Sequence, residues 1–147
     1  MRPTELLSFM RQHSLAVQAS VSASGYPQAA VVGIVVSDDF EAFFDAVDSN
    51  RKVENLRRSP PIALVIGGMT QGDERTVQYE GVADEPTGTE LQRLKELYFE
   101  SFPAGRERQS WPDITYLRAR PSWIRYSDFN RDPPQIAEFN HGDLGLD

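Results

Sequence analysis

Ser49-Asn50-Arg51-Lys52-Val53-Glu54-Asn55-Leu56 has the pattern of a short helix that begins with two positive charges. Ser49 is a favourable N-cap, which would place Arg51 and Lys52 in the first helical turn. Unpaired backbone N–H groups and the helix dipole make that end positive, so each cation costs about 0.3–1 kcal/mol. A bound anion, most often phosphate, would reverse the sign. A solvated helix start that tolerates the charges explains these residues equally well.

Strand patterns lie on both sides of this helix. Leu15, Val17, Ala19 and Val21 alternate with polar or small residues, the period of a half-buried strand. The other strand patterns cover residues 28–36, 40–47, 62–66, 76–83, 114–119 and 122–126. Most connections are short, and a helix does not follow each strand as a doubly wound sheet requires. The sequence therefore predicts a mainly β fold, a small antiparallel barrel with peripheral helices.

The strand at residues 28–36 is almost wholly apolar and β-branched, which indicates cover on both faces. The barrel core would cover one face, and a partner subunit is one candidate for the other. The length of 147 residues fits one domain. We place that domain at residues 1–126 and expect residues 127–147 to form a C-terminal arm or a frayed tail.

Composition excludes several classes of function. The formal charge of −7 opposes binding to nucleic acid and to anionic membranes. The chain has no cysteine, which removes disulfides and thiolate chemistry and makes the cytoplasm the default location. No apolar run is long enough to span a membrane. His13 and His141 are too isolated for a metal site, and the glycine-rich loop at 67–72 lacks the lysine of a nucleotide-binding loop.

Four segments, in this order and spacing, resemble the pyridoxamine 5′-phosphate oxidase-like family of FMN-binding split barrels. They are the Gly25-Tyr26-Pro27 turn with the following apolar strand, the Ser49 to Pro60 segment, Val77-Gln78-Tyr79-Glu80-Gly81-Val82-Ala83, and Pro121-Ser122-Trp123-Ile124-Arg125-Tyr126. The resemblance covers nearly the whole chain and implies a six-stranded antiparallel split barrel. It also implies a homodimer that holds two FMN molecules at the subunit interface. The partner subunit is then a candidate surface for packing of the C-terminal arm.

The resemblance also assigns roles to individual residues. Arg51 and Lys52, with Ser49, look like the residues that bind the flavin phosphate. The family places the flavin ring along one strand and the ribityl chain near the next. It also brings residues of a later strand and of the partner subunit to the flavin. In this chain the corresponding positions are Val31, Val32 and Gly33 beside the ring, Phe44 and Asp45 near the ribityl chain and the phosphate, Thr76 and Gln78 from the later strand, and Trp123 and Arg125 from the partner.

Some of these residues also have simpler explanations. Alternation alone makes Thr76 and Gln78 the wet face of an edge strand. Trp123 is typical of a core or interface aromatic, and Arg125 of an ion pair with the acidic tail.

The chain departs from the true oxidase at its C-terminal substrate motif, where Arg125-Tyr126-Ser127-Asp128-Phe129 stands instead of an Arg-x-His-Asp/Glu-Arg pattern. Oxidation of pyridoxamine phosphate is therefore not expected, and the chain is closer to the small general-stress-protein-like members.

Two functions follow. The first is an FMN-dependent oxidoreductase that acts on a small molecule, with NADPH or NADH as a candidate electron donor and no metal. The second is a protein on the same fold that holds FMN or a deazaflavin for sensing or storage.

Overall fold

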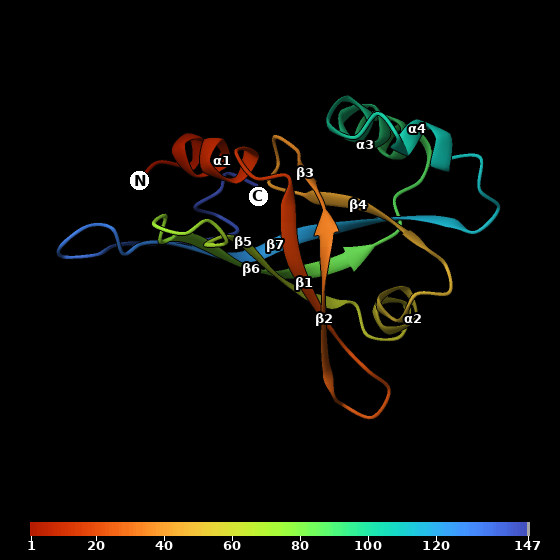
Figure 1. The fold of residues 1–147 in the computed structure, drawn as a ribbon, viewed down its shortest axis with the longest axis horizontal. Helices are drawn as coiled ribbons and strands as arrows, with labels where there is room; N and C mark the ends of the chain where they lie inside the picture. The colour runs from red at the N-terminus through yellow and green to blue at the C-terminus, as the bar shows by residue number, and fades with distance from the viewer. Residues whose placement is uncertain (147) are drawn as a thin grey trace.

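The computed structural model describes residues 1–146, and its main element is an eight-stranded antiparallel sheet that curls into a barrel (Figure 1). The strands are β1 (Leu15–Val21), β2 (Pro27–Gly33), β3 (Val35–Val36), β4 (Ala42–Val47), β5 (Pro61–Gly67), β6 (Arg75–Asp84), β7 (Ile114–Asp128) and β8 (Gln135–Asn140). The helices are α1 (Pro3–Arg11), α2 (Arg51–Arg58), α3 (Gly88–Ser101) and α4 (Gly105–Arg108). The predicted fold class is confirmed, with more strands than the six expected.

The two strands at opposite ends of the sheet, β2 and β3, follow each other directly in the sequence. In the order β2-β1-β5-β6-β7-β4-β3, β2 pairs with β1 at one end and β3 pairs with β4 at the other. Only Ile34 separates β2 from β3. Within residues 1–146, β2 therefore has no strand partner on its second edge. The barrel is open between β2 and β4, and α2 follows directly after β4.

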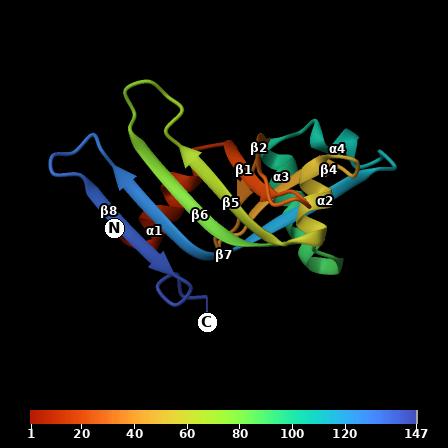
Figure 2. The same ribbon diagram turned by 90° about the horizontal axis from the view of Figure 1, so that it is seen from below.

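The core lies inside the curled sheet. Strand residues such as Leu64, Tyr79 and Ile124 point inward, and the apolar face of α2 contributes Val53 and Leu56. The helix α1 lies on the opposite side of the barrel from α2, α3 and α4 (Figure 2). Because Val53 and Leu56 of α2 are part of the core, their packing fixes the start of α2 beside the opening of the barrel.

The outer face of the sheet carries exposed apolar side chains. Val31 is 60% exposed, and Val17 and Val65 stand directly opposite it along the register of β2, β1 and β5. Single exposed apolar residues are normal, but a contiguous set on one face is typical of an interface. Residues 28–36 were predicted to be buried on both faces of the strand. This holds for Ile34 to Val36, whereas Val31 on the outer face is exposed to solvent in the single chain.

Two strand predictions are corrected. Residues 114–119 and 122–126 belong to one strand, β7, which continues through Pro121. The register shifts between Glu80 and Gly81, and Ser122 is the extra residue of the resulting bulge. A bulge accommodates proline, which has no N–H for the ladder. A Cβ at Gly81 would clash with the carbonyl oxygen of Arg120, so the bulge depends on glycine there.

The C-terminal arm is also more ordered than expected. Residues 135–140 of the predicted arm form β8, which pairs antiparallel with β7 of the same chain. Leu144, beyond β8, is buried in the core of the same protomer. Packing of the arm on a partner stays a prediction, and Asp147 lies outside the described residues.

Candidate functional site

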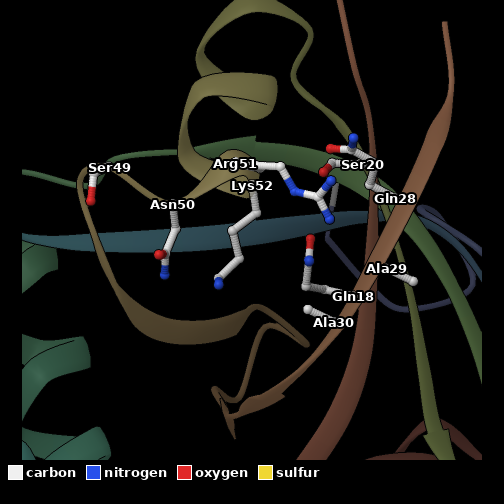
Figure 3. A pocket seen from close by; sticks show the side chains of 9 residues that line it. All are labelled: Gln18, Ser20, Gln28, Ala29, Ala30, Ser49, Asn50, Arg51 and Lys52. Atoms are coloured by element: carbon white, nitrogen blue, oxygen red, sulfur yellow. The ribbon is translucent and has the colours of Figure 1, made fainter.

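A polar pocket lies at the opening of the barrel, between the first turn of α2 and the strands β1 and β2 (Figure 3). Its volume is about 320 Å³, within the range of small-molecule sites. Both strands, the turn before α2 and the start of α2 contribute to it. The lining residues are Gln18, Ser20, Gln28, Ala29, Ala30, Ser49, Asn50, Arg51 and Lys52.

The start of α2 differs by one residue from the prediction. The N-cap is Asn50 rather than Ser49, and its side chain makes no capping hydrogen bond. Arg51 and Lys52 are therefore the first two helical residues, as the charge argument requires. The hydrogen bonds within residues 1–146 include none from the backbone N–H groups of these two residues. Two backbone N–H donors and two cationic side chains thus stand together at the pocket.

Lys52 is held in an environment that disfavours its charge. Partial burial lowers the pKa of Lys52, and the carboxylate of Asp45 opposes this effect only in part. A phosphate group in the pocket would add a second negative charge and favour the protonated amine. The local electrostatics therefore favour an anionic ligand.

The carboxylate of Asp45 forms hydrogen bonds with residues of α3 and α4. Its carboxylate accepts hydrogen bonds from the Tyr98 hydroxyl at 3.1 Å and from Nε of Arg108 at 2.8 Å. Burial, followed by the charge of Asp45, raises the pKa of Tyr98 to about 12, so the hydroxyl remains a donor. Arg108 thus forms an ion pair with Asp45. Asp45 lies beside Lys52 but does not line the pocket.

Asn55 connects α2 to the wall of the pocket. Its buried Nδ2 donates to Ser20 Oγ at 3.1 Å and to Gln28 Oε1 at 2.9 Å. Its Oδ1 accepts a hydrogen bond from Arg58 at 3.0 Å. One amide thus fixes the distance between the helix start and the β1–β2 hairpin.

We predict that Asn55→Ala destabilises the protein by about 1–3 kcal/mol, because Ser20 and Gln28 lose a buried donor. Chemical unfolding followed by circular dichroism measures the change. Gln92→Ala, on an exposed turn of α3, is the control and should change stability by less than about 0.5 kcal/mol. Equal stability of the two variants would show that the Asn55 hydrogen bonds do not hold the hairpin.

The residues predicted to lie beside the flavin ring, Val31 to Gly33, are at the end of β2, the strand with an unpaired edge within residues 1–146. Val32 is buried, Val31 is exposed on the outer face, and Gly33 lies beneath the ring of Phe102. A Cβ at Gly33 would lie 2.8 Å from Phe102 Cζ, so a larger residue there would have to displace the ring of Phe102. Phe44, predicted near the ribityl chain and the phosphate, is fully buried in the core and does not line the pocket.

The remaining predicted residues lie on the outer face of the sheet. Gln78 stands opposite Val65 on β5 and opposite Arg125 on β7. Thr76 and Trp123 occupy the same face by alternation. None of these four residues, Thr76, Gln78, Trp123 and Arg125, lines the pocket of its own chain. One protomer therefore does not bring the two halves of the predicted site together.

Sequence reasoning missed Gln18, Ser20 and Gln28. The alternation in β1 suggested that its valines and leucine face the core, but the structure buries Ala16, Gln18 and Ser20 instead. Burial of polar side chains is costly unless they have polar partners, so a strand with its polar side chains on the buried face is expected to line a polar cavity. The sequence signal for this arrangement is the apolar character of Leu15, Val17, Ala19 and Val21 on the outer face, which a subunit interface also explains.

No group of three or more histidine, cysteine, aspartate or glutamate side chains within residues 1–146 could hold a metal ion. None of the helices in this range has the length and apolar character needed to cross a bilayer.

The model of the pyridoxamine 5′-phosphate oxidase family matches residues 3–128 of the chain. Among solved structures, a heme-binding protein from Mycobacterium smegmatis has a TM-score of 0.84 and 16% identity, over 98% of this chain and 60% of that one. HutZ, the heme storage protein from Vibrio cholerae, has a TM-score of 0.70 and 17% identity, over 82% and 91% of the two chains.

A pyridoxamine 5′-phosphate oxidase-related, FMN-binding protein from Nostoc punctiforme has a TM-score of 0.69 and 12% identity, over 93% of this chain and 87% of that one. At these identities the likeness to solved structures shows the fold alone. The chain spans 60% and 62% of the length of the first two structures that it matches. None of the curated proteins matches it in sequence.

Proposed function

Because the chain belongs to the pyridoxamine 5′-phosphate oxidase family, we propose that it binds FMN at the start of α2 and acts as a flavin-dependent oxidoreductase on a small molecule. One observation carries the proposal: Arg51 and Lys52 line a pocket with their backbone N–H groups unpaired within residues 1–146. Anions bind at such a helix start through the N–H groups and the dipole together.

The residues present fit FMN at both ends of the pocket. Ser49, Arg51 and Lys52 would hold the phosphate. The free edge of β2 at Val31 to Gly33 would lie along the ring, whose polar atoms suit backbone donors and acceptors. Gln18 contributes a buried side-chain oxygen with no partner in residues 1–146, which a bound ligand would satisfy.

Heme is the second candidate, because two structures of the same fold are of heme-binding and heme storage proteins. Heme iron is held in proteins by histidine, cysteine, methionine or tyrosine. The pocket lining contains none of these four residue types. The cations would suit heme carboxylates, but the lining itself offers no axial ligand for the iron, which supports FMN over heme.

FMN, when bound, supplies hydride and single-electron transfer, and for this reason no acid/base pair is needed in the protein. The chain's own residues hold the phosphate and present a backbone edge to the ring. A protein that only stores or senses FMN or a deazaflavin would use the same residues. Pyridoxamine phosphate is not the proposed substrate, because the Arg125 to Phe129 segment lacks the oxidase motif. We place the protein in the cytoplasm, which the absence of cysteine supports.

Reconstitution tests the proposal. Purified protein is titrated separately with FMN, a deazaflavin phosphate and heme, and binding is followed by flavin fluorescence or the heme Soret band. Saturable binding of FMN is expected, and binding of heme alone would overturn the assignment. Reduction of the bound flavin by NADPH or NADH, with reoxidation by an acceptor, identifies the enzyme. A flavin that stays oxidised with both donors supports storage or sensing.

The proposal includes a homodimer. The exposed valines on the outer face provide an apolar surface, and Trp123 and Arg125 lie on that face rather than at their own pocket. A second copy packed there would cover the valines and would bring Trp123 and Arg125 to the partner's flavin. This arrangement explains why one protomer leaves the predicted site in two halves.

We expect Val65→Glu to weaken the dimer at least about 100-fold, because a carboxylate buried in an apolar interface has no partner. Sedimentation velocity over a concentration series measures the dissociation constant. Met69→Glu, in the exposed β5–β6 loop, is the matched control and should leave the dimer intact. A wild-type protein that binds flavin as a stable monomer would contradict the dimer.

A further inference from the structure

Gln18 is a buried amide whose oxygen has no partner. It lies in the middle of β1, between Ala30 of β2 and Leu64 of β5, and it is 2% exposed. No donor within residues 1–146 reaches its Oε1. An unpaired polar atom in the interior is destabilising, so proteins keep one mainly where a ligand or an ordered water pairs with it.

The side chain is directed into the pocket rather than into the core. Figure 3 shows the Gln18 side chain in the space between β1 and the start of α2, on the side where Arg51 reaches across. A ligand whose phosphate group is held by Arg51 and Lys52 would therefore bring the atoms next to that phosphate toward Gln18.

The chemistry of that part of the ligand follows from the missing partner. Phosphate oxygens accept hydrogen bonds and cannot satisfy the oxygen of Gln18, and the same holds for an ionised carboxylate. A hydroxyl group both donates and accepts, so it pairs with the amide through either of its two ends.

Gln28 complements Gln18 on the neighbouring strand. Its Oε1 already accepts from Asn55 at 2.9 Å, so its amide orientation is fixed. The Nε2 group is then the part of Gln28 left to donate to the pocket. An acceptor site at Gln18 and a donor site at Gln28 suit a chain that carries several hydroxyl groups.

We propose that Gln18 and Gln28 form a subsite for the polyol chain of a phosphate ester, with Gln18 as the residue that distinguishes a hydroxylated chain from an alkyl one. In FMN this chain is the ribityl group, so the inference rests on the proposed function and deepens it. Asn55 acts through Gln28 and is a positioning residue.

The test compares two ligands and two proteins in one cycle. The ligands are FMN and a flavin phosphate in which a plain pentyl chain replaces the ribityl chain. The proteins are the wild type and Gln18→Met, with Gln18→Leu as a second variant of similar size. Flavin fluorescence gives the four dissociation constants, and the coupling between the two changes isolates the Gln18 contact with the hydroxyls.

The wild type should bind FMN about five- to tenfold more tightly than the pentyl analogue, as expected for one or two net hydrogen bonds. Gln18→Met should reduce this ratio to about one and leave the affinity for the pentyl analogue unchanged. The ligand-free variant should melt about 2–4 °C higher than the wild type, because an unpaired buried amide is removed. Gln92→Met, on an exposed turn of α3, should change neither quantity.

Two outcomes overturn the inference. Equal affinity of the wild type for FMN and for the pentyl analogue would show that the protein does not recognise the ribityl hydroxyl groups. An unchanged ratio in Gln18→Met with a lower melting temperature would make Gln18 a structural residue. Both leave FMN binding intact, whereas failure of the proposed function appears as a wild type that binds neither flavin.

Discussion

Arg51→Glu combined with Lys52→Glu is expected to abolish FMN binding while the fold remains intact. Charge-assisted hydrogen bonds contribute about 1.5–3 kcal/mol each, so the loss of two weakens binding at least about 100-fold. Reversal of both charges adds repulsion of the phosphate at the same helix start. The fold should survive because both side chains lie at the edge of the pocket and neither belongs to the core cluster.

The measurement compares FMN with riboflavin, which lacks the phosphate. The double variant should lose its preference for FMN and keep any weak affinity for riboflavin. A control with the same change in net charge is Arg106→Glu with Arg131→Glu, two exposed residues outside the pocket. If the pocket variant and this control bind FMN with the same affinity, the phosphate assignment is wrong.

Arg118→Met is expected to lower the free energy of unfolding by about 3–5 kcal/mol, the usual effect of breaking a buried ion pair. Arg118 is 2% exposed and donates to Asp84, Glu41 and Glu90 at distances of 2.8–3.1 Å. These carboxylates come from β6, from the residue before β4 and from α3. Removal of the guanidinium therefore leaves Glu41, itself buried, without its closest compensating charge.

Arg120→Met is the matched control for this variant. Arg120 lies two residues further along β7, contacts only Asp84 among the same carboxylates, and its side chain is 55% exposed. Because exposed ion pairs contribute little, its loss should cost less than about 1 kcal/mol. Denaturant titration of both variants gives the difference, and similar values would show that the Arg118 cluster does not hold α3 to the sheet.

The same cluster predicts how stability responds to acid. Burial alone would raise the pKa of Glu41, but hydrogen bonds from Ser37 and Arg93 and the charge of Arg118 outweigh it, so the pKa is lowered. A lowered folded pKa gives stability that is present above the unfolded value of 4.5 and lost as the pH falls through the folded value. The wild type should therefore lose more stability than Arg118→Met below about pH 4.5.

The sequence predicted the helical half of the site because charge at a helix start is a local property. Arg51 and Lys52 fall in the first turn of α2 whether Ser49 or Asn50 is the cap. The strand half was harder to predict. The alternation in β1 does not show that Gln18 lies on the buried side, because an outer apolar face that packs on a partner has the same alternation as an inner core face.

The placement of Thr76, Gln78, Trp123 and Arg125 could not be decided from one chain for a related reason. The structure confirms the predicted strand at β6 and includes predicted residues 122–126 in the longer strand β7. Alternation shows which of the two faces of a strand a side chain lies on, but it does not show on which face a ligand binds. Pro121 caused the remaining error in the fold. It was interpreted as a break between two strands, whereas the extra residue Ser122 allows β7 to continue through a bulge.

The strand order has a consequence for protein synthesis. Every residue that lines the pocket lies between positions 18 and 52, whereas β5, β6 and β7, which occupy the middle of the sheet, begin only at Pro61. A nascent chain that has just emerged from the ribosome as far as α2 thus carries every pocket side chain but lacks the strands that hold β1 and α2 together. Cofactor loading should therefore follow release of the central strands, and stalled shorter chains should not retain FMN.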